Sequence, residues 1–512
     1  MLLIESRRAR AEKLHADRLL PYVDDEGVDG RAATMIADVL IRGGTLVSEH
    51  EAAPADLAIR DGRVAAVLEP GAGGVRADAE IDATGRLVLP GLVDCHVHFN
   101  EPGRTHWEGY ATGSAAAAAG GITTFLDMPL NNDPPTLDGA SLDVKQRAVA
   151  DKSVVDYGLW GGIVPASVGS AEVGQTGVRP AGGALAELHA GGVVAAKAFM
   201  CHSGLDGYPG VDDASLLAAL RTAAGLGLIV GLHAESDGLT TALGAEAQAA
   251  GRREPRAWAD SRPPLTEIEP VQRALLLARE AGASVHFVHV STPEAAGMVA
   301  AARAAGVAAT LETCPHYLAL DEDDLARLGP IAKCAPPLRP RATVEALWRA
   351  VLAGQIDYIA SDHSPCPPED KQRGADDIWR AWGGISGVQT LLPVLLTEGI
   401  HKRGLPLTQL VRLTSTSPAR RFGLYPRKGT LRVGSDADVT IVDPEREWTL
   451  DASQLKTRWP IGPFVGRTFK GAVEATLVRG RVVHRAGETV AAPGHGRRVM
   501  PAPSRRMLAG TL

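Results

Sequence analysis

Residues 88–136 decide how we interpret this chain, and they read VLPGLVDCHVHFNEPGRTHWEGYATGSAAAAAGGITTFLDMPLNNDPPT. A short apolar run leads into His96 and His98. Residues two apart in a strand point to the same side, so these imidazoles would face a common centre. Neutral imidazole suits zinc and its first-row neighbours as a ligand. The pair alone is weak evidence, because two strand histidines equally well form a polar face or a buried hydrogen-bonded pair.

The composition is that of an ordinary enzyme-sized protein. With 512 residues, of which 45% are hydrophobic and 22% charged, the chain can bury a large core and form more than one structural unit. A net charge of -7 provides no basic surface for nucleic acid and no polybasic patch for an acidic membrane. No stretch approaches the roughly 20 apolar residues of a membrane span. We therefore expect a small neutral or anionic metabolite as the partner.

The cysteines indicate the compartment. They are few and scattered, without a CxxC pair, so the sequence predicts neither a disulfide framework nor a structural zinc site. The N-terminus also lacks an apolar segment of signal-peptide length. We expect a reducing, cytoplasmic location. The five cysteines are Cys95, Cys201, Cys314, Cys334 and Cys366.

Changes in residue pattern along the chain predict its domains. Residues 1–35 are charged and predict an extension outside the core. Short β-like runs with Gly and Asp-Gly turn signals fill 36–89 and return in 425–490, which indicates one small composite β-sandwich domain built from both chain ends. The middle, 90–424, then folds as an insertion. The tail, 491–512, is either disordered or a clasp on a neighbouring subunit.

The middle segment alternates apolar runs with alanine- and leucine-rich helical stretches, which is typical of βα units around a parallel sheet. Eight candidate strands over about 330 residues predict an α/β fold of the (β/α)8 TIM-like barrel type. Chemistry in such barrels lies at the C-terminal ends of the strands. The candidate strands are 92–99, 121–128, 155–164, 192–200, 227–235, 284–292, 307–315 and 356–364.

Six metal-binding side chains end five of these strands. A single strand-end histidine is more often structural, but six such groups without metal would be a costly set of buried polar groups. The lysine among them has three possible roles: a salt-bridge partner, a Schiff-base nucleophile, or an anion that bridges two metal ions after carbon dioxide carboxylates its amine. The surrounding metal-binding residues favour the carboxylated form. The six are His96, His98, Lys197, His233, His289 and Asp362.

Several motifs resemble one known family. DCHVHFNEPGRTHWEGY, AAAGGITTFLDMPLNNDPPT, AKAFM, GLHAE, HVST, CPHYL, CAPPLR and ASDHSPC occur in this order along the barrel. Together they resemble the cyclic amidohydrolases of the amidohydrolase superfamily. Among the cyclic amidohydrolases, the resemblance to the allantoinase family is the strongest. The resemblance implies the accompanying sandwich domain, a homotetramer, and two divalent ions, zinc foremost with cobalt, manganese or nickel as alternatives. The implied ligands are His96, His98, N6-carboxylated Lys197, His233, His289 and Asp362.

The choice within the family rests on fewer residues. Dihydroorotases resemble HVHLREPG here, with an arginine for the substrate carboxylate, whereas this chain has Asn100, which suits a neutral ring with ureido and imide groups. Arg104 is the alternative residue that could bind a substrate carboxylate. Hydantoinases and dihydropyrimidinases, the nearest alternative, differ after the second strand, where this chain has Asn131 in DMPLNNDPPT. Both asparagines have loop structure as an alternative explanation. We place two further substrate contacts at Cys334 and Ser364.

The expected reaction is metal-assisted hydrolysis of the cyclic amide of allantoin to allantoate. Coordination makes water nucleophilic near neutral pH, and Asp362 would take its proton and deliver it to the leaving ring nitrogen. The rival from another class is a non-catalytic scaffold, as some relatives of these barrels become after losing metal ligands. No expected ligand is missing in this chain.

Overall fold

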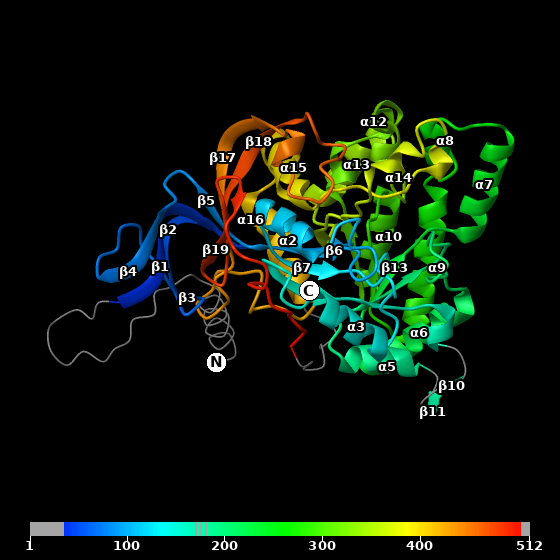
Figure 1. Ribbon diagram of the computed structural model, residues 1–512, viewed down its shortest axis with the longest axis horizontal. Coiled ribbons are helices and arrows are strands. Elements are labelled where there is room, and N and C mark those ends of the chain that lie inside the picture. The colour runs from blue at the N-terminus through cyan, green and yellow to red at the C-terminus, as the bar shows by residue number, and fades with distance from the viewer. Residues whose placement is uncertain (1–34, 169–171, 175–176, 180–181, 503–512) are drawn as a thin grey trace, which may run out of the picture.

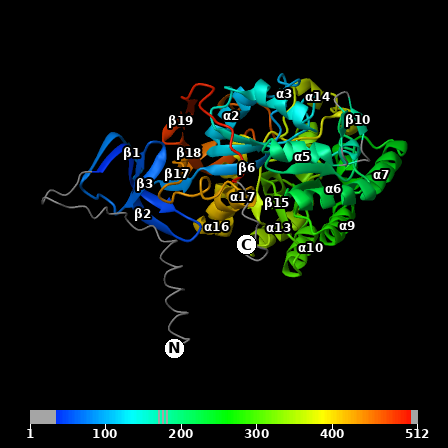
Figure 2. The same ribbon diagram turned by 90° about the horizontal axis from the view of Figure 1, so that it is seen from below.

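The structure is a computed structural model that describes residues 35–502 apart from 169–171, 175–176 and 180–181. The predicted N-terminal extension up to residue 34 and the last ten residues of the predicted tail lie outside the described residues. Figure 1 shows a sheet of strands from both chain ends beside a larger α/β unit. Figure 2 shows the same two units side by side from below.

The smaller unit is one continuous sheet of nine strands that combines both chain ends. Its order is β20-β19-β18-β17-β5-β1-β2-β3, with β4 paired to β1. The sheet is mixed, since β1 pairs parallel with both β4 and β5 and antiparallel with β2. The strands are β1 (Met35–Val47), β2 (Ala52–Arg60), β3 (Arg63–Leu68), β4 (Val75–Asp82), β5 (Leu87–Pro90), β17 (Val439–Thr449), β18 (Thr468–Val478), β19 (Arg481–Arg485) and β20 (Glu488–Thr489).

The first strand joins the two parts of this sheet. Its register shifts between Ile41 and Gly44, and its first part pairs with β4 while its last part reaches β5. At Gly44 a Cβ atom would lie 2.5 Å from the Val88 side chain, so β5 can approach only a glycine. Strand β17 then pairs antiparallel with β5, which brings Val439 opposite Pro90. Apolar residues from both chain ends form one buried core, which confirms the composite sandwich.

The larger unit is an eight-stranded barrel, as the sequence predicted. Consecutive strands pair parallel, and a parallel bridge between Val97 and His363 closes the circle. Each predicted strand range contains one observed strand; the third is split in two. The strands are β6 (Leu92–Val97), β7 (Ile122–Asp127), β8 (Asp156–Leu159) with β9 (Gly161–Gly162), β12 (Ala196–Phe199), β13 (Val230–His233), β14 (Val285–Phe287), β15 (Ala309–Thr313) and β16 (Tyr358–Ile359).

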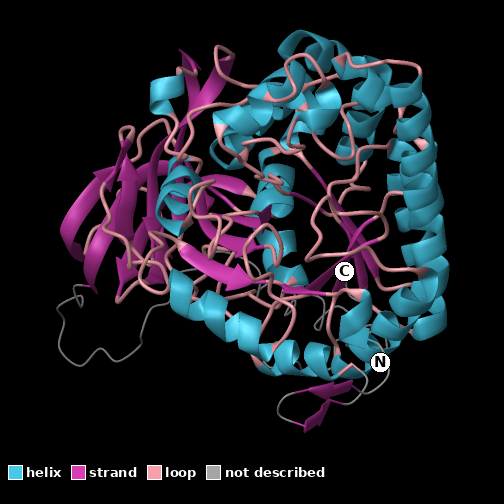
Figure 3. Cartoon of the chain, turned by 45° about the vertical axis from the view of Figure 1, so that its right-hand side comes forward, coloured by secondary structure: helices cyan, strands magenta, loops and turns pink. Residues whose placement is uncertain are grey.

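Helices surround the barrel strands (Figure 3). Their ends follow local capping chemistry: the Asp212 carboxylate accepts a hydrogen bond from the Ser215 amide at 2.7 Å, and α6 stops at Gly227 in the left-handed region. The longer helices are α2 (Tyr110–Ala119), α3 (Gly139–Val149), α5 (Gly183–Ala190), α6 (Asp213–Leu226), α7 (Asp237–Ala249), α9 (Leu265–Ala281), α10 (Pro293–Ala304), α12 (Glu322–Leu328) and α13 (Arg341–Leu352).

Shorter elements fill the connections. The short α-helices are α4 (Pro165–Val168), α8 (Pro255–Asp260), α11 (Pro315–Ala319), α14 (Pro368–Gln372), α15 (Leu391–Val394), α16 (Leu407–Val411) and α17 (Ser417–Arg421). The 3-10 helices are η1 (Gly329–Ala332), η2 (Ile378–Arg380), η3 (Val388–Thr390) and η6 (Ala452–Gln454), and the π-helices are η4 (Leu395–His401) and η5 (Arg412–Thr416). A hairpin joins β10 (Glu172–Gly174) and β11 (Gly177–Arg179).

Buried charges fasten the two units together at the end of the barrel where β8 begins. The Lys428 ammonium lies 2.5 Å from Asp156, 3.0 Å from Asp436 and 2.6 Å from Asp438. The Arg479 guanidinium also pairs with Asp156. We call these five residues the anchor network. It joins the first residue of a barrel strand to the segments that enter and leave the sheet strands β17 and β18.

The described part of the tail crosses the same end of the barrel. The Tyr157 amide donates to the Arg497 carbonyl at 3.0 Å, and the Val499 amide donates to the Tyr157 carbonyl at 2.7 Å. The Arg497 amide donates to Asp156 of the anchor network at 2.8 Å. Residues 494–499 therefore add to the third barrel strand of their own chain, whereas the sequence left disorder and a clasp on a neighbouring subunit as the alternatives.

The division at 89/90 and 424/425 stays a prediction, which the positions of β5, β6 and β17 support. In the described ranges, no helix is both long and apolar enough to cross a lipid bilayer.

Candidate active site

The six predicted ligands meet at the C-terminal ends of the barrel strands. His96 lies in β6 and His98 directly follows it, Lys197 lies in β12, and His233 is the last residue of β13. His289 follows β14 and Asp362 follows β16. All six side chains are buried. We call them the mouth cluster.

The first half of the mouth cluster gathers around Asp362. Its Oδ1 lies 3.1 Å from His96 Nε2 and 3.6 Å from His98 Nε2. The ligand atoms of these three residues all lie within 4.8 Å of one another, which is close enough for a single ion. The Lys197 Nζ lies 3.0 Å from His96 Nε2. In the second half, His233 Nδ1 lies 2.9 Å from His289 Nε2.

Burial sets the protonation of this cluster. Burial lowers the pKa of His96, His98 and His289. The nearby Lys197 lowers the pKa of His96 further, and the nearby His233 lowers the pKa of His289 further. Burial lowers the pKa of Lys197 to about 8. Burial opposes ionisation of Asp362, but the contact with His98 and the charge of Lys197 hold the pKa of that carboxyl below its usual value. The cluster therefore combines the neutral imidazoles of His96, His98 and His289 with the carboxylate of Asp362.

The residues present fit two divalent cations. Within the described residues, the Nδ1 atoms of His98 and His289 are buried without a hydrogen-bond partner. Apart from those of Asp362, the close contacts of the cluster join two imidazoles, or an imidazole and an amine, and such groups gain little from each other unless a cation accepts their lone pairs. Four imidazoles, one carboxylate and a lysine are a donor set suited to zinc or another first-row ion.

The sequence analysis missed two glutamates that back this cluster. Glu312 Oε1 lies 2.6 Å from His96 Nδ1, and Glu235 Oε2 lies 2.9 Å from His233 Nε2. Without metal, burial raises the pKa of Glu312 to about 8, and cations at the cluster would lower it again. For Glu235, contacts with His233 and Arg262 outweigh burial and lower the pKa. Glu235 is the last residue of the motif GLHAE, and Glu312 lies two residues before the motif CPHYL. Their placement at or near a strand end was the available signal.

Two ligands adopt an unusual backbone conformation. His289 has φ of 41° and Asp362 has φ of 45°, in the left-handed region. For a residue other than glycine this conformation costs on the order of 1 kcal/mol and persists where the surroundings enforce it. Such strain concentrates at functional sites. It supports a functional rather than a structural role for these strand ends.

The two predicted asparagines have a backbone reason for their identity. Asn100 has φ of 62° and Asn131 has φ of 69°, and asparagine tolerates this region well. The alternative explanation as loop residues is therefore supported. Asn100 also keeps free binding capacity, because its buried Oδ1 has no partner among the described residues and its Nδ2 lies 3.5 Å from the Pro365 carbonyl.

The other predicted substrate residues lie around the strand-end loops. Cys334 is buried, burial raises the pKa of its thiol to about 12, and its carbonyl accepts a hydrogen bond from Trp258 at 2.7 Å. Ser364 is buried two residues after Asp362. The Arg104 guanidinium lies over the Trp107 ring, 5.2 Å from its centroid. Across the described ranges, no hydrogen bond or ion pair joins Arg104 or Asn131 to the mouth cluster.

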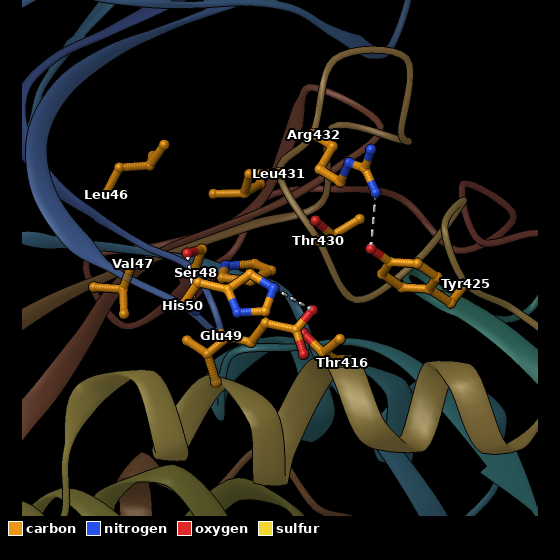
Figure 4. Close-up of a pocket in the computed structure, with 12 residues that line it drawn as sticks. Leu46, Val47, Ser48, Glu49, His50, Thr416, Tyr425, Thr430, Leu431 and Arg432 are labelled. Atoms are coloured by element: carbon orange, nitrogen blue, oxygen red, sulfur yellow. Dashed lines mark hydrogen bonds and ion pairs between the residues drawn. The ribbon is translucent and has the colours of Figure 1, made fainter. Parts of the chain in front are cut away.

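A hollow of about 240 Å³ lies beside this loop system, lined among others by Cys366, Ser386 and Ile461. Ile461 comes from the connection between β17 and β18, so the composite sheet contributes to the rim of the barrel mouth. A separate hollow of about 440 Å³ lies where β1 and β5 meet η5, with His50, Glu49 and Tyr425 around it (Figure 4). Its lining includes none of the mouth cluster.

Comparison with protein families agrees with this geometry. Residues 87–483 match the amidohydrolase family. The chain belongs to the amidohydrolase family. This range begins in β5 and ends in β19, so the amidohydrolase match includes the whole barrel and the returning strands of the composite sheet.

Relatives of known name agree with the resemblance seen in the motifs. The allantoinase of Rubrobacter xylanophilus is 49% identical over 464 residues, which are 91% of this chain and 98% of the relative. The allantoinase of Deinococcus radiodurans is 45% identical over 467 residues, 91% of this chain and 99% of the relative. The predicted similarity of this amidohydrolase to allantoinases is confirmed.

Solved structures confirm the fold. The L-hydantoinase (dihydropyrimidinase) of Arthrobacter aurescens matches with a TM-score of 0.85 and 36% sequence identity, over 91% of this chain and 100% of that one. A D-hydantoinase matches with a TM-score of 0.81 and 32% identity, over 90% and 98% of the two chains. The prediction of a TIM-like barrel with a small sandwich is therefore confirmed for this amidohydrolase.

Proposed function

We propose that the protein hydrolyses the cyclic amide of allantoin to allantoate. The observation that carries this proposal is the 49% identity to an allantoinase over 91% of the chain, together with a mouth cluster in which every expected ligand is present. Hydrolysis of a cyclic C–N amide bond is the reaction class of the family to which the chain belongs. The scaffold alternative loses its basis, because scaffolds of this type lack ligands.

The mouth cluster would hold two divalent ions, zinc foremost, with cobalt, manganese or nickel as alternatives. When bound, such ions polarise the amide carbonyl and lower the pKa of a water ligand. The first half of the cluster offers His96, His98 and Asp362, and the second offers His233 and His289. Lys197 lies against the first half, and carboxylation of its amine would replace a cation with a bridging anion.

Asp362 is the group that would move the proton. Its carboxylate lies at the cluster beside His96 and His98, and it is held ionised. It takes a proton from the attacking water while the water oxygen bonds to the amide carbon. The ring C–N bond then breaks, and the same carboxyl returns the proton to the leaving nitrogen. The products are a carboxylic acid, which releases its remaining proton to solvent and becomes a carboxylate, and a free ureido nitrogen, so atoms and charge balance.

Substrate contacts would come from the loops that follow the strands. Asn100 offers a buried amide with an unpartnered oxygen, which suits the N–H groups of a neutral ring. The backbone around Cys334 and the Ser364 hydroxyl lie in the neighbouring loops. We propose Asn131 and Arg104 as contacts to the ureido substituent.

A hydantoinase or dihydropyrimidinase is the second candidate. The match to an L-hydantoinase (dihydropyrimidinase) structure at a TM-score of 0.85 favours it. Its sequence identity of 36% is below the 49% of the allantoinase relative, and we therefore rank it second. Dihydroorotase is third, because Asn100 replaces the expected carboxylate clamp.

Assembly and location complete the proposal. We propose a homotetramer, as the resemblance implies, and a cytoplasmic location, which five buried unpaired thiols support. We also propose that residues 36–89 and 425–490 form the composite domain and 90–424 the catalytic barrel, with 1–35 and 491–512 as extensions.

The test is a comparison of hydrolysis rates of the metal-replete protein on four substrates: allantoin, dihydrouracil, a 5-substituted hydantoin and dihydroorotate. We expect allantoin to turn over fastest and the Asp362→Asn variant to be inactive while it keeps its metal. Faster turnover of the hydantoin or dihydrouracil would favour the second candidate. An Asp362→Asn variant with the wild-type rate would disprove the role of Asp362.

A further inference from the structure

We propose that Glu312 and Glu235 are positioning residues that each control one half of the metal centre. Each fixes which ring nitrogen of a histidine faces the cations, and neither binds a cation itself. The inference rests on the proposed function, because it requires that the mouth cluster holds two ions.

Glu312 determines the orientation of His96. The His96 Nδ1 lies 2.6 Å from Glu312 Oε1, while the opposite nitrogen, Nε2, faces Lys197 and Asp362. Both side chains are fully buried. A neutral imidazole carries one ring proton, and a carboxylate beside Nδ1 holds it there. The lone pair of Nε2 is then directed into the cluster.

Glu312 is itself held in place from its other side. Its Oε2 lies 3.1 Å from His286 Nε2, and the Tyr358 hydroxyl lies 2.9 Å from the same nitrogen. The His286 and Tyr358 rings stack with centroids 4.9 Å apart. His286 belongs to no predicted ligand set, and this arrangement gives it a purpose. It leaves Glu312 one rotamer, in which Oε1 points at His96.

Glu235 determines the orientation of His233 in the second half of the cluster, but it contacts Nε2 rather than Nδ1 of the ring. The His233 Nε2 lies 2.9 Å from Glu235 Oε2, so it is Nδ1 of His233 that faces His289. Glu235 Oε1 lies 3.6 Å from the Arg262 guanidinium, which lies over the Trp258 ring at 3.5 Å. Glu235 therefore contacts the ring nitrogen on one side and forms an ion pair without a hydrogen bond on the other, and through the first contact it orients His233 as Glu312 orients His96.

One rival explanation for Glu235 is a metal site of its own. The ligand atoms of Cys201, His233 and Glu235 lie within 4.8 Å of one another. An ion there would be next to the Arg262 guanidinium, which repels it, and would compete for the ring proton that keeps Nδ1 of His233 available. Arg262 already supplies a positive charge beside Glu235, so a positioning role fits Glu235 better than a role as a metal ligand.

The two glutamates divide the cluster evenly. The rings of His98 and His289 have no such support, since their Nδ1 atoms are unpartnered within the described ranges; the His289 backbone amide donates to Glu312 Oε1 at 3.3 Å. Each half thus contains one histidine backed by a carboxylate and one without. Removing a carboxylate partner of a ligating histidine typically weakens metal binding by about 10- to 100-fold. Each glutamate should therefore affect the retention of one ion more than the other.

The experiment uses full-length Glu312→Gln and Glu235→Gln proteins loaded with zinc or cobalt. Bound metal per chain is followed by elemental analysis during timed exposure to a chelator, and the absorption spectrum of the cobalt form reports the ligand geometry. We expect the wild type to hold two ions and each variant to release one ion about 10- to 100-fold faster. The cobalt spectra of the two variants should differ from each other.

The control is Glu398→Gln, which removes a buried glutamate whose partners include Lys402 and Arg403. It should keep both ions at the wild-type rate. If Glu312→Gln does not fold, Glu312→Asp keeps the charge but withdraws it by one methylene group, and it should release one ion at an intermediate rate.

The inference is overturned if a wild type with two ions is matched by both variants in release rate and spectrum. It is also overturned if either variant loses both ions together, since that indicates a general loss of structure. A wild type that hydrolyses allantoin and binds no metal would contradict the metal centre itself, which is a separate outcome from the failure of this inference.

Discussion

Two groups of buried charges lie at opposite ends of the barrel strands, and they are satisfied in different ways. In the anchor network, the Lys428 ammonium lies within 3.0 Å of three carboxylates. In the mouth cluster, the Lys197 amine lies 3.0 Å from a histidine nitrogen. Burial of a charge is tolerated when opposite charges and hydrogen bonds surround it, and the anchor network meets that condition with groups of the chain alone.

The mouth cluster does not meet that condition with the chain's own groups. Its single carboxylate, Asp362, faces four imidazoles and an amine, and two ring nitrogens in the described part of the chain have no partner. The contrast separates structural polar burial from functional polar burial. A buried network that satisfies itself fastens parts of the fold together, whereas one that does not is completed by a ligand.

The largest effect should come from Lys197→Ala. This change removes the proposed bridging ligand, and we expect loss of bound metal and a fall in turnover of roughly 1,000-fold or more, because metal ions supply several kcal/mol of transition-state stabilisation. Elemental analysis and an allantoin assay measure both. The melting temperature of the metal-free protein should not fall, since a buried amine beside His96 is removed. Partial rescue by a small carboxylic acid would support carboxylation, and a variant with full metal content would contradict it.

The next largest effect should come from the anchor network. Lys428→Met removes the cation shared by three buried carboxylates and leaves Asp156 with Arg479 and Asp436 with Arg427. We expect the free energy of unfolding to drop by roughly 3–5 kcal/mol. Denaturant unfolding measures it, and KM and kcat of the folded enzyme should stay unchanged. The matched control is Lys402→Met, which removes an exposed lysine paired with Glu398 and should change stability by about 0–1 kcal/mol. Equal effects of the two changes would argue against the network.

A smaller effect should come from a change at Asn100 that tests whether its side chain binds substrate or only favours the left-handed backbone. Glycine keeps the left-handed backbone, so Asn100→Gly removes only the amide. We expect KM for allantoin to rise about ten-fold, equal to about 1.4 kcal/mol, with little change in stability. Asp151→Gly is the control, because Asp151 has φ of 57° and is exposed. An unchanged KM would show that Asn100 is there for the loop alone.

The smallest effect concerns a buried histidine that belongs to neither group. Burial, with a contribution from Lys456, lowers the pKa of His484 to about 4, against 6.5 in an unfolded chain. Between these values the unfolded state binds more protons. Stability is therefore complete above about pH 6.5 and is lost as the pH falls toward 4, at no more than about 1.4 kcal/mol per pH unit.

Replacing His484 with leucine should make the stability less sensitive to acid. The measurement is the unfolding midpoint of His484→Leu and of the wild type between pH 7 and pH 4. We expect the difference between the two proteins to change by roughly 1–3 kcal/mol over this range in favour of the variant. Parallel pH profiles would mean that His484 keeps the same protonation when the protein unfolds.

The sequence predicted those parts of the molecule that local patterns encode. Each barrel strand is a short apolar run, and each ligand follows or ends such a run, so His233 and Asp362 were placed by their position alone. The parallel barrel then brings strand ends together from distant parts of the chain. The eight strands and the composite sheet followed from the same reasoning.

The remaining parts depend on contacts that no local pattern encodes. Asp156 and Lys428 are 272 positions apart, and nothing near either residue indicates the other. Glu312 lies inside β15, and its inward direction depends on the register between neighbouring strands. The parallel pairing of β1 with β5 and the course of the tail are of the same kind. Such features require the folded arrangement, because a contact is a property of two segments.

The pairing of β5 with β17 also sets an order of events on the ribosome. Val439 is opposite Pro90, so the partner of β5 is made 349 residues later. At about 5–20 residues per second, synthesis of that interval takes roughly 20–70 seconds. During this time the edge of β5 has no strand to bind and is open to wrong pairing with other nascent chains. The N-terminal strands must therefore wait, shielded by chaperones or by the growing barrel, until translation is nearly over.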